Sequence, residues 1–254
     1  GMKAFNEGGN VKILQSNKTD LCSLSILAMK QIKKWIDNGD NPSDIAVLCR
    51  NNFHLAILSN MLLREGIYCN YTNDMKLTKS YMYSDIKNII NICDTTWKPE
   101  LTRSIMWKLC RYMSLANAAF IAEVQDTSAL SLEDTLGWLT KNFIDKNIEF
   151  NKPIKVSVQL DEKAKYTMSK MSSETLNDIK LVYNTLKLED KVEKLETLMY
   201  KYMESAAYLY KSRDKSRSIQ GLVIYIKNLI KKDGYDNMLE FLRVTEQLED
   251  GRMV

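Results

Sequence analysis

The sequence predicts an α/β part, in which helices flank a parallel sheet, followed by an all-helical part. Near the start of the chain, short apolar runs alternate with helical patterns over about 60 residues, which is typical of strand–helix–strand units. From residue 97 onward, apolar residues recur at helical spacing with almost no strand pattern. Glycine (9 residues) and proline (3 residues) are scarce, which argues against an all-β fold rich in turns. We place the domain boundary near residue 94, between an α/β domain (1–94) and a helical domain (95–254).

Strands and helices alternate in the part before this boundary. The run at 45–48 is apolar throughout and is bounded by polar residues, a pattern typical of a strand buried on both faces. The helix after it carries Leu55, Leu58 and Leu62 on one face, and Gly66 is its stop signal. The expected order is a strand at 11–14, a helix from Asp20 to Asn38, the strand at 45–48, the helix ending at Gly66, a strand at 67–71 and a helix at 84–93. This order favours a parallel sheet with right-handed crossovers.

Stripes of apolar residues mark a series of helices beyond the boundary. One stripe runs over 101–113, and Ser131 and Ser173 are in position to cap two further helices. The segment 154–160 alternates weakly, so it is either a short strand or an extended connector. The last helices are expected around 192–209, 222–229 and 238–248. Three tryptophans are expected in the core of this part: Trp97, Trp107 and Trp138.

Arg50 is the strongest candidate for a site residue. It comes directly after the predicted strand at 45–48, and ligands of open parallel sheets bind outside the carboxyl ends of the strands. The alternative is a surface arginine at a strand end that pairs with a nearby carboxylate.

The residues around Arg50 resemble a known motif. Residues 44–52, the leucine-rich helix after them and the run from Arg64 to Ile67 are similar to the fourth helicase motif of the UvrD/Rep family of superfamily 1 DNA helicases. Residues 85–87 resemble the start of the helix that leads into the accessory domain of that family. The resemblance implies that residues 1–94 are part of a second RecA-like domain and that residues 95–254 are its helical accessory insertion. The chain is then expected to be a piece of such a helicase.

The resemblance also implies nucleotide chemistry for the whole enzyme. These helicases bind ATP with Mg between two RecA-like domains, and an arginine at the position of Arg50 stabilises the charge on the γ-phosphate. Cys49 stands where the family usually has a tyrosine that stacks on adenine. The sequence has no GxxxxGKS/T motif and no Gly-Lys pair, so the chain alone is expected to hold no cofactor. Its expected partner is the missing first RecA-like domain of the same protein.

The densest basic segment of the chain is a second candidate site. Lys211, Arg213, Lys215 and Arg217 follow a stretch with tyrosines at positions 200, 202, 208 and 210. Basic side chains for phosphates and aromatic rings for stacking suit nucleic acid, so the expected partner is DNA, single-stranded or at a junction. The alternative is a solvated turn between two helices whose tyrosines pack in the core.

The composition excludes several other classes of function. The five cysteines include no CxxC pair and the one histidine is His54, so no metal site is expected. The cysteines are expected to be buried and reduced, in a cytoplasmic protein. No apolar run approaches the roughly 18 residues of a membrane span, so no membrane partner is expected. A net charge of +4 is too small to argue for nucleic acid by itself.

These patterns lead to one expected function and one alternative. We expect part of an ATP-dependent DNA helicase or translocase of the UvrD/Rep type, which serves DNA unwinding, repair or recombination and is not ATPase-competent as an isolated chain. The alternative is a non-catalytic DNA- or protein-binding module derived from a helicase domain. Cys49 favours the alternative, whereas the order of strand, arginine and leucine-rich helix favours the helicase.

Overall fold

The computed structural model describes residues 13, 15, 21–49, 52–70, 75–94, 97–210, 213–233 and 238–251. All regular secondary structure in these residues is helical, and no strand occurs among them. The α-helices are α1 (Leu21–Asp37), α2 (Asn52–Arg64), α3 (Tyr81–Asp94), α4 (Pro99–Leu109), α5 (Leu115–Thr127), α6 (Leu132–Leu139), α7 (Val158–Ser169), α8 (Ser173–Leu186), α9 (Lys191–Tyr210), α10 (Arg213–Asp233) and α11 (Met238–Glu249). Short 3-10 helices, η1 (Pro42–Asp44) and η3 (Leu77–Lys79), and a π-helix, η4 (Thr140–Ile144), lie between them.

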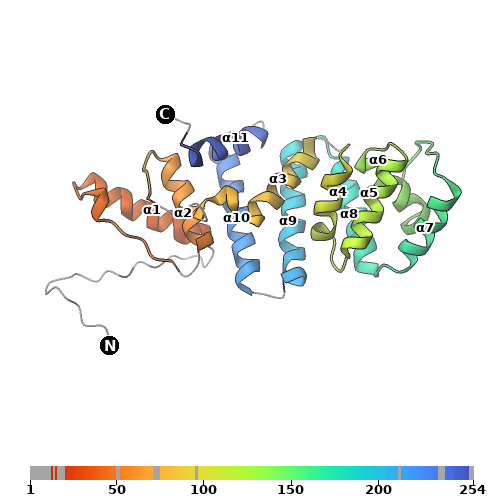
Figure 1. The fold of residues 1–254 in the computed structure, drawn as a ribbon, viewed down its shortest axis with the longest axis horizontal. Coiled ribbons are helices and arrows are strands. Elements are labelled where there is room, and N and C mark those ends of the chain that lie inside the picture. Colours follow the sequence, from red (N-terminus) through yellow and green to blue (C-terminus); the bar gives the residue numbers. More distant parts are fainter. Residues whose placement is uncertain are drawn as a thin grey trace.

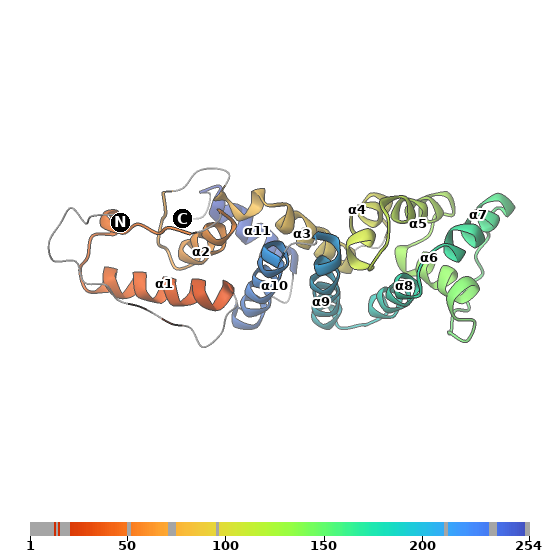
Figure 2. The same ribbon diagram turned by 90° about the horizontal axis from the view of Figure 1, so that it is seen from below.

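The helices form an elongated row (Figures 1 and 2). At one end, α1 and α2 pack against each other, α10 packs against both, and α11 packs against α2. In the middle, α3 lies against α9 and α4, and α5, α6, α8 and α7 form the far end (Figure 1). The chain therefore runs outward from α3 to α7 and returns through α8 and α9. This path brings α10 and α11 back beside α1 and α2.

Serine side chains begin several of the helices. Ser131 accepts a hydrogen bond from the Asp134 amide at 3.0 Å at the start of α6, which confirms the predicted cap. At α8 the cap is Ser172 rather than the predicted Ser173, because Ser172 accepts from the Thr175 amide at 3.2 Å.

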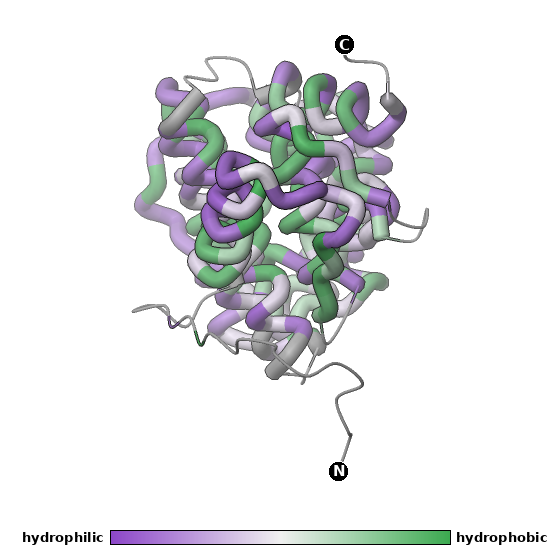
Figure 3. The backbone as a smooth tube through the Cα atoms, turned by 90° about the vertical axis from the view of Figure 1, so that its left-hand side faces the viewer, coloured by the Kyte–Doolittle hydropathy of each residue, from purple (hydrophilic) through white to green (hydrophobic). Residues whose placement is uncertain are grey.

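A continuous core runs through the row. Hydrophilic and hydrophobic stretches alternate along the helices (Figure 3), so each helix can turn an apolar side toward its neighbours. The main core extends from Ile57 on α2 through Tyr202 on α9 to Ile179 on α8. A small second cluster between α1 and α2 consists of Ile32, Leu58 and Leu62. None of the described helices has the length and apolar composition needed to cross a membrane.

The expected parallel sheet is not formed, so the α/β fold class with a RecA-like sheet was wrong and the fold is all-helical. Residues 45–48, predicted as a strand buried on both faces, lie with Cys49 in an extended segment at the surface, where Leu48 is 97% exposed. Ile45 packs on the small cluster between α1 and α2, so only one side of the segment meets the protein. A strand needs a neighbour to pair with. Among the described residues, no hydrogen bond joins the backbone of 46–49 to another segment.

The segment 67–70 forms no strand, and most of the strand predicted at 11–14 lies outside the described residues. Only Ile13 of the first strand's core lies in the described part of the chain, and it is 89% exposed. In the segment 67–70, Ile67 and Cys69 pack on the cluster between α1 and α2, whereas Tyr68 points outward and is 75% exposed. In the segments 45–49 and 67–70, inward-facing and exposed side chains occur side by side, as they do in a strand. Both segments cover the α1–α2 pair without pairing with each other.

The helical predictions agree better with the structure. Gly66, at a φ of +75°, ends α2 as predicted. The domain boundary predicted near residue 94 lies at the end of α3, and the main core includes residues on both sides of it. α5 was not predicted, and α7 begins within the segment 154–160. Trp138 is buried as expected, whereas Trp97 is 60% exposed and its prediction was wrong.

Candidate nucleic-acid interface

The site residues predicted from the sequence fall in two regions. Arg50 and Lys211 lie outside the described residues. Arg213 is the first residue of α10, and Lys215 and Arg217 follow in its first turns with exposed side chains. Because the strand expected before Arg50 is an exposed extended segment, the assignment of Arg50 rests on the family resemblance alone.

The basic residues of α10 lie at the end of a helical hairpin. α9 and α10 pack against each other, and α9 ends at Tyr210 just before α10 begins at Arg213 (Figure 1). The last turn of α9 and the first turns of α10 are therefore neighbours. Tyr208, in the last turn of α9, is 44% exposed at this end, whereas Tyr202 is fully buried. The tyrosines of α9 thus divide between the core and the surface.

Tyr112 from another part of the chain joins this end of the hairpin. It lies in the turn between α4 and α5, with its ring centroid 5.3 Å from that of Tyr208 and an angle of 70° between the ring planes. Its side chain is exposed, and its φ of 59° lies in the left-handed region that residues other than glycine seldom adopt. We call Tyr112, Tyr208, Lys215 and Arg217 the hairpin-end surface.

Arg111 fixes the turn that carries Tyr112. Its backbone N–H and its Nε donate to Asp178 Oδ2 at 2.8 and 3.0 Å, and its Nη2 donates to Asp178 Oδ1 at 2.9 Å. Thr175 Oγ1 donates to the Arg111 carbonyl at 2.7 Å. Both partners belong to α8, so the turn is attached to that helix at both the N–H and the C=O of Arg111. The hydrogen bond to Asp178 raises the pKa of Arg111 above its ordinary range, so its charge is permanent.

Two charged residues of α9 complete the cluster around Asp178. Lys201 Nζ lies 2.5 Å from Asp178 Oδ1 and 2.7 Å from Glu204 Oε2. Glu204 Oε1 in turn lies 3.6 Å from Arg111 Nη1. Two cations and two anions balance one another, so the cluster fixes the turn without adding net charge to the surface.

The hairpin-end surface combines two kinds of group that nucleic acids bind. The exposed ammonium of Lys215 and guanidinium of Arg217 suit phosphate oxygens. The exposed rings of Tyr112 and Tyr208 suit the flat faces of bases.

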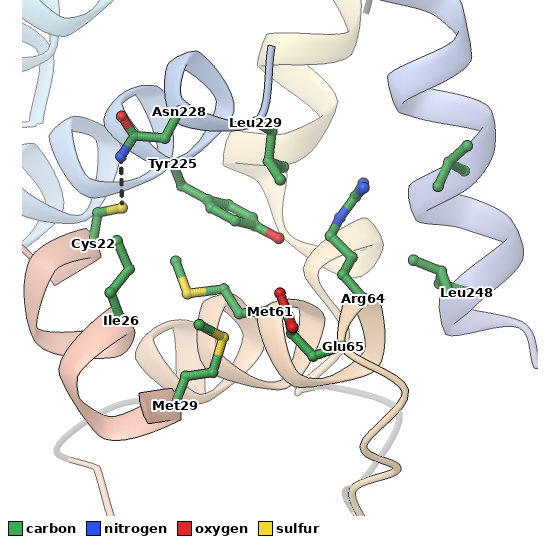
Figure 4. Close-up of a pocket in the computed structure, with 11 residues that line it drawn as sticks. Cys22, Ile26, Met29, Met61, Arg64, Glu65, Tyr225, Asn228, Leu229 and Leu248 are labelled. Carbon is green, nitrogen blue, oxygen red and sulfur yellow. Dashed lines mark hydrogen bonds between the residues drawn. The ribbon is translucent and has the colours of Figure 1, made fainter. Parts of the chain in front are cut away.

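A pocket of about 350 Å³ lies between α1, α2, α10 and α11 (Figure 4). Arg64 and Glu65 reach it from the end of α2, and Tyr225 reaches it from α10. The Tyr225 hydroxyl donates to Asn60 Oδ1 at 2.5 Å, and Lys33 Nζ donates to Glu65 Oε2 at 2.6 Å. The other lining residues are Cys22, Ile26, Met29, Met61, Asn228, Leu229, Val244 and Leu248. This largely apolar wall suits a small apolar molecule, and it uses the C-terminal half of α10, away from Lys215 and Arg217.

Metal ligands and disulfides do not contribute to a site in the residues that the structure describes. No group of histidine, cysteine, aspartate and glutamate side chains there is placed to hold a metal ion. All five cysteines are free thiols. Cys22, Cys93 and Cys110 are buried as expected, whereas Cys49 is exposed.

Sequence reasoning missed Tyr112 and its supports. No local pattern marks a tyrosine with a left-handed φ, and Asp178 lies 67 residues from Arg111 in the chain. The available signal was composition, since Arg111-Tyr112 is a cation followed by an aromatic residue near the end of the apolar stripe at 101–113.

Comparisons with known proteins leave the chain without a family assignment. No family model matches the sequence, and neither a curated protein nor a solved structure matches the chain.

Proposed function

We propose that this chain is a DNA-binding part of an ATP-dependent DNA helicase of the UvrD/Rep type, and that it contributes binding rather than ATP hydrolysis. The resemblance over 44–67 and 85–87 supports the helicase. The observation that carries the DNA contact is the hairpin-end surface, where Lys215 and Arg217 are exposed at the same end of the α9–α10 hairpin as Tyr208 and Tyr112.

Phosphate contacts have a measurable signature. Each cation that neutralises a phosphate releases counterions, so affinity falls as the salt concentration rises. The logarithm of the binding constant falls linearly with the logarithm of the salt concentration, by about 0.9 for each phosphate contact on a duplex. If Lys215 and Arg217 each bind a phosphate, removing both should lower this slope by about 2.

The experiment compares two double variants by fluorescence anisotropy with a labelled duplex that carries a single-stranded end. Lys215→Glu with Arg217→Glu should weaken binding at a salt concentration of about 50 mM and flatten the salt dependence up to about 200 mM. The control is Lys165→Glu with Lys170→Glu, at α7 on the far end of the row, which changes the net charge equally. Equal affinity and slope in the two double variants would remove the hairpin-end surface from the proposal.

Arg50 remains a prediction of the proposed helicase. In the full-length enzyme it would stabilise the transferred phosphoryl group of ATP with Mg. Arg50→Ala should then lower kcat for ATP hydrolysis by orders of magnitude with little change in nucleotide affinity. A kcat near that of the unaltered enzyme would contradict this role.

A second candidate function is protein binding, and the exposed segment 45–49 favours it. Leu48 is 97% exposed, Val47 is 36% exposed, and Tyr68 of the neighbouring extended segment is 75% exposed. Leu48→Lys should abolish co-purification with the ATP-binding domain of the same helicase while leaving DNA affinity unchanged. The control is Val158→Lys, which alters an 81% exposed valine at the start of α7. Retained co-purification in the Leu48 variant would argue against this candidate.

A further inference from the structure

We infer that Tyr112 and Tyr208 form a stacking platform for an unpaired nucleobase, so that the DNA held at the hairpin-end surface has a single-stranded part there. This inference rests on the proposed function, because it specifies which form of DNA the surface takes.

The backbone of Tyr112 is the first observation. A residue with a side chain is strained at a φ of 59°, and glycine or asparagine would adopt that conformation with less strain. Burial of the ring does not compensate, because the residue is 61% exposed. A tyrosine at this position is therefore unfavourable for the turn and contributes little to the core. Strained residues that the surrounding structure holds in place are found preferentially at binding and catalytic sites.

The surroundings of the turn hold Tyr112 in this conformation. Arg111 makes three hydrogen bonds to Asp178, and Thr175 donates a fourth to its carbonyl. Asp178 is 2% exposed at its side chain, so these bonds are shielded from water. The turn is thereby fixed on α8, and the ring of Tyr112 is presented toward Tyr208.

Both rings keep part of their surface accessible to a base. They meet edge to face, with centroids 5.3 Å apart and planes at 70°, and an edge contact covers less of a ring than parallel stacking does. Tyr112 and Tyr208 are 61% and 44% exposed after this contact. A base inside a duplex has both faces covered by its neighbours, so an internal base must be unpaired before it can stack on these rings.

The charges nearby divide into two groups with different roles. The guanidinium of Arg111 is bound to Asp178 and lies near Glu204, so it supports the turn. Lys215 and Arg217 lie in the first turns of α10, beside the end of α9 that carries Tyr208. We expect the phosphates of a strand stacked on the rings to continue along this end of the hairpin, where these two cations are exposed.

The test uses a labelled oligothymidylate of about 12 nucleotides and a blunt duplex as probes. Tyr112→Asn removes the ring and keeps a residue that tolerates a left-handed φ, so the turn should persist. We expect this variant to lose about 5- to 100-fold in affinity for the oligothymidylate, with unchanged affinity for the duplex and an unchanged salt slope. Tyr112→Trp should retain the single-strand affinity.

Measurements of stability distinguish a stacking role of Tyr112 from a purely structural role. Tyr112→Gly should leave the midpoint of urea unfolding unchanged or higher, and still lose single-strand affinity. The control is Tyr166→Ala, which removes a 68% exposed ring on α7 and should change neither affinity. Unchanged oligothymidylate binding in both Tyr112→Asn and Tyr112→Gly would overturn the platform.

The platform and the proposed function fail in different ways. If the Tyr112 variants bind normally while Lys215→Glu with Arg217→Glu weakens both probes, the platform is wrong and the DNA interface stands. If the unaltered chain binds neither probe at a salt concentration of about 50 mM, both are overturned.

Discussion

Lys201 Nζ lies 2.5 Å from Asp178 Oδ1, and only 4% and 2% of the two side chains are exposed. This buried ion pair joins α9 to α8, and Arg111 attaches the α4–α5 turn to the same carboxylate. Asp178 is therefore the point at which three separate segments meet beneath the hairpin-end surface.

Removing Asp178 should destabilise the protein far more than removing Lys201. Asp178→Ala removes the buried carboxylate that Arg111 and Lys201 share and leaves Lys201 with Glu204 alone, and breaking a buried pair costs about 3–5 kcal/mol. Lys201→Met leaves Asp178 hydrogen-bonded to Arg111, so its cost should be smaller. Urea unfolding monitored by circular dichroism gives both free energies of unfolding.

A matched control for these variants is the exposed pair Lys163–Glu123, whose side chains are 51% and 44% exposed. Lys163→Met should change the free energy of unfolding by no more than about 0.5 kcal/mol, because exposed pairs contribute little. Equal costs for Lys163→Met and Asp178→Ala would contradict the central role of Asp178.

The cluster should also make stability fall in acid. Burial acts to raise the pKa of Asp178, but hydrogen bonds from Arg111 and Lys201 outweigh it and hold the pKa below the ordinary value of 3.8. Because the folded-state pKa is the lower one, the unfolded chain binds the proton first. The stability from this group is complete above pH 3.8 and is lost as the pH falls through the folded-state pKa.

Asp178→Asn isolates this effect among the other carboxylates. The difference in free energy of unfolding between the unaltered protein and the variant should be constant at neutral pH and should shrink below about pH 4. Chemical unfolding at a series of pH values measures it. A difference that grows in acid would mean that the folded-state pKa of Asp178 lies above the ordinary value.

Glu249 should be needed to hold α11 on the rest of the molecule. Its Oε1 accepts from the Leu77 amide at 2.9 Å, and its Oε2 accepts from the Thr78 amide at 2.9 Å. Asn60 Nδ2 donates to Oε1 at 3.3 Å, and Glu249 is 4% exposed. Glu249→Ala leaves these donors without the carboxylate, at a cost of about 2–3 kcal/mol.

Glu249→Gln gives a residue-specific measurement of the same contact. Its amide has one oxygen, so it can replace only one of the two carboxylate acceptors. Hydrogen exchange at the Leu77 or Thr78 amide should become faster in this variant, whereas Glu246→Gln, which alters a pair with Lys87 at the surface, should leave both amides unchanged. Unchanged exchange in the Glu249 variant would show that these amides are protected by other means.

Much of the helical architecture could be predicted from the sequence, because its signals are local. Apolar stripes and caps such as Ser131 lie within one or two turns of the residues they order. α5 was missed because it is apolar on most sides, with Phe120, Ile121 and Val124 all buried. A helix buried in this way has no polar face to reveal its period.

The sheet was predicted wrongly because an apolar run does not specify what it packs against. Ile45, Ile67 and Cys69 do turn inward at alternate positions, as strand residues would, but they rest on α1 and α2. Whether such segments pair depends on a neighbouring strand, which the run itself does not encode.

The candidate site was predicted in part. Lys215 and Arg217 were named from basic composition, and both are exposed, as a DNA contact and a solvated turn would each require. Tyr112 and Asp178 were missed, because their roles depend on contacts across 67 residues of chain between Arg111 and Asp178.

Cysteine labelling should test the surface position of the segment 45–49. Cys49 is exposed and Cys69 is half-buried, whereas Cys22, Cys93 and Cys110 are buried. Burial raises the pKa of Cys93 to about 12 and raises that of Cys110 as well, which keeps these thiols protonated and unreactive.

Under native conditions, a thiol reagent such as iodoacetamide should therefore modify Cys49 first and Cys69 more slowly. Cys22, Cys93 and Cys110 should react only after unfolding in urea. Mass spectrometry of proteolytic fragments identifies each site, and Cys49→Ser should remove the fastest phase. Protection of Cys49 at a level similar to Cys93 would instead place 45–49 inside a packed layer, as the sequence first suggested, and would contradict the extended surface segment described above.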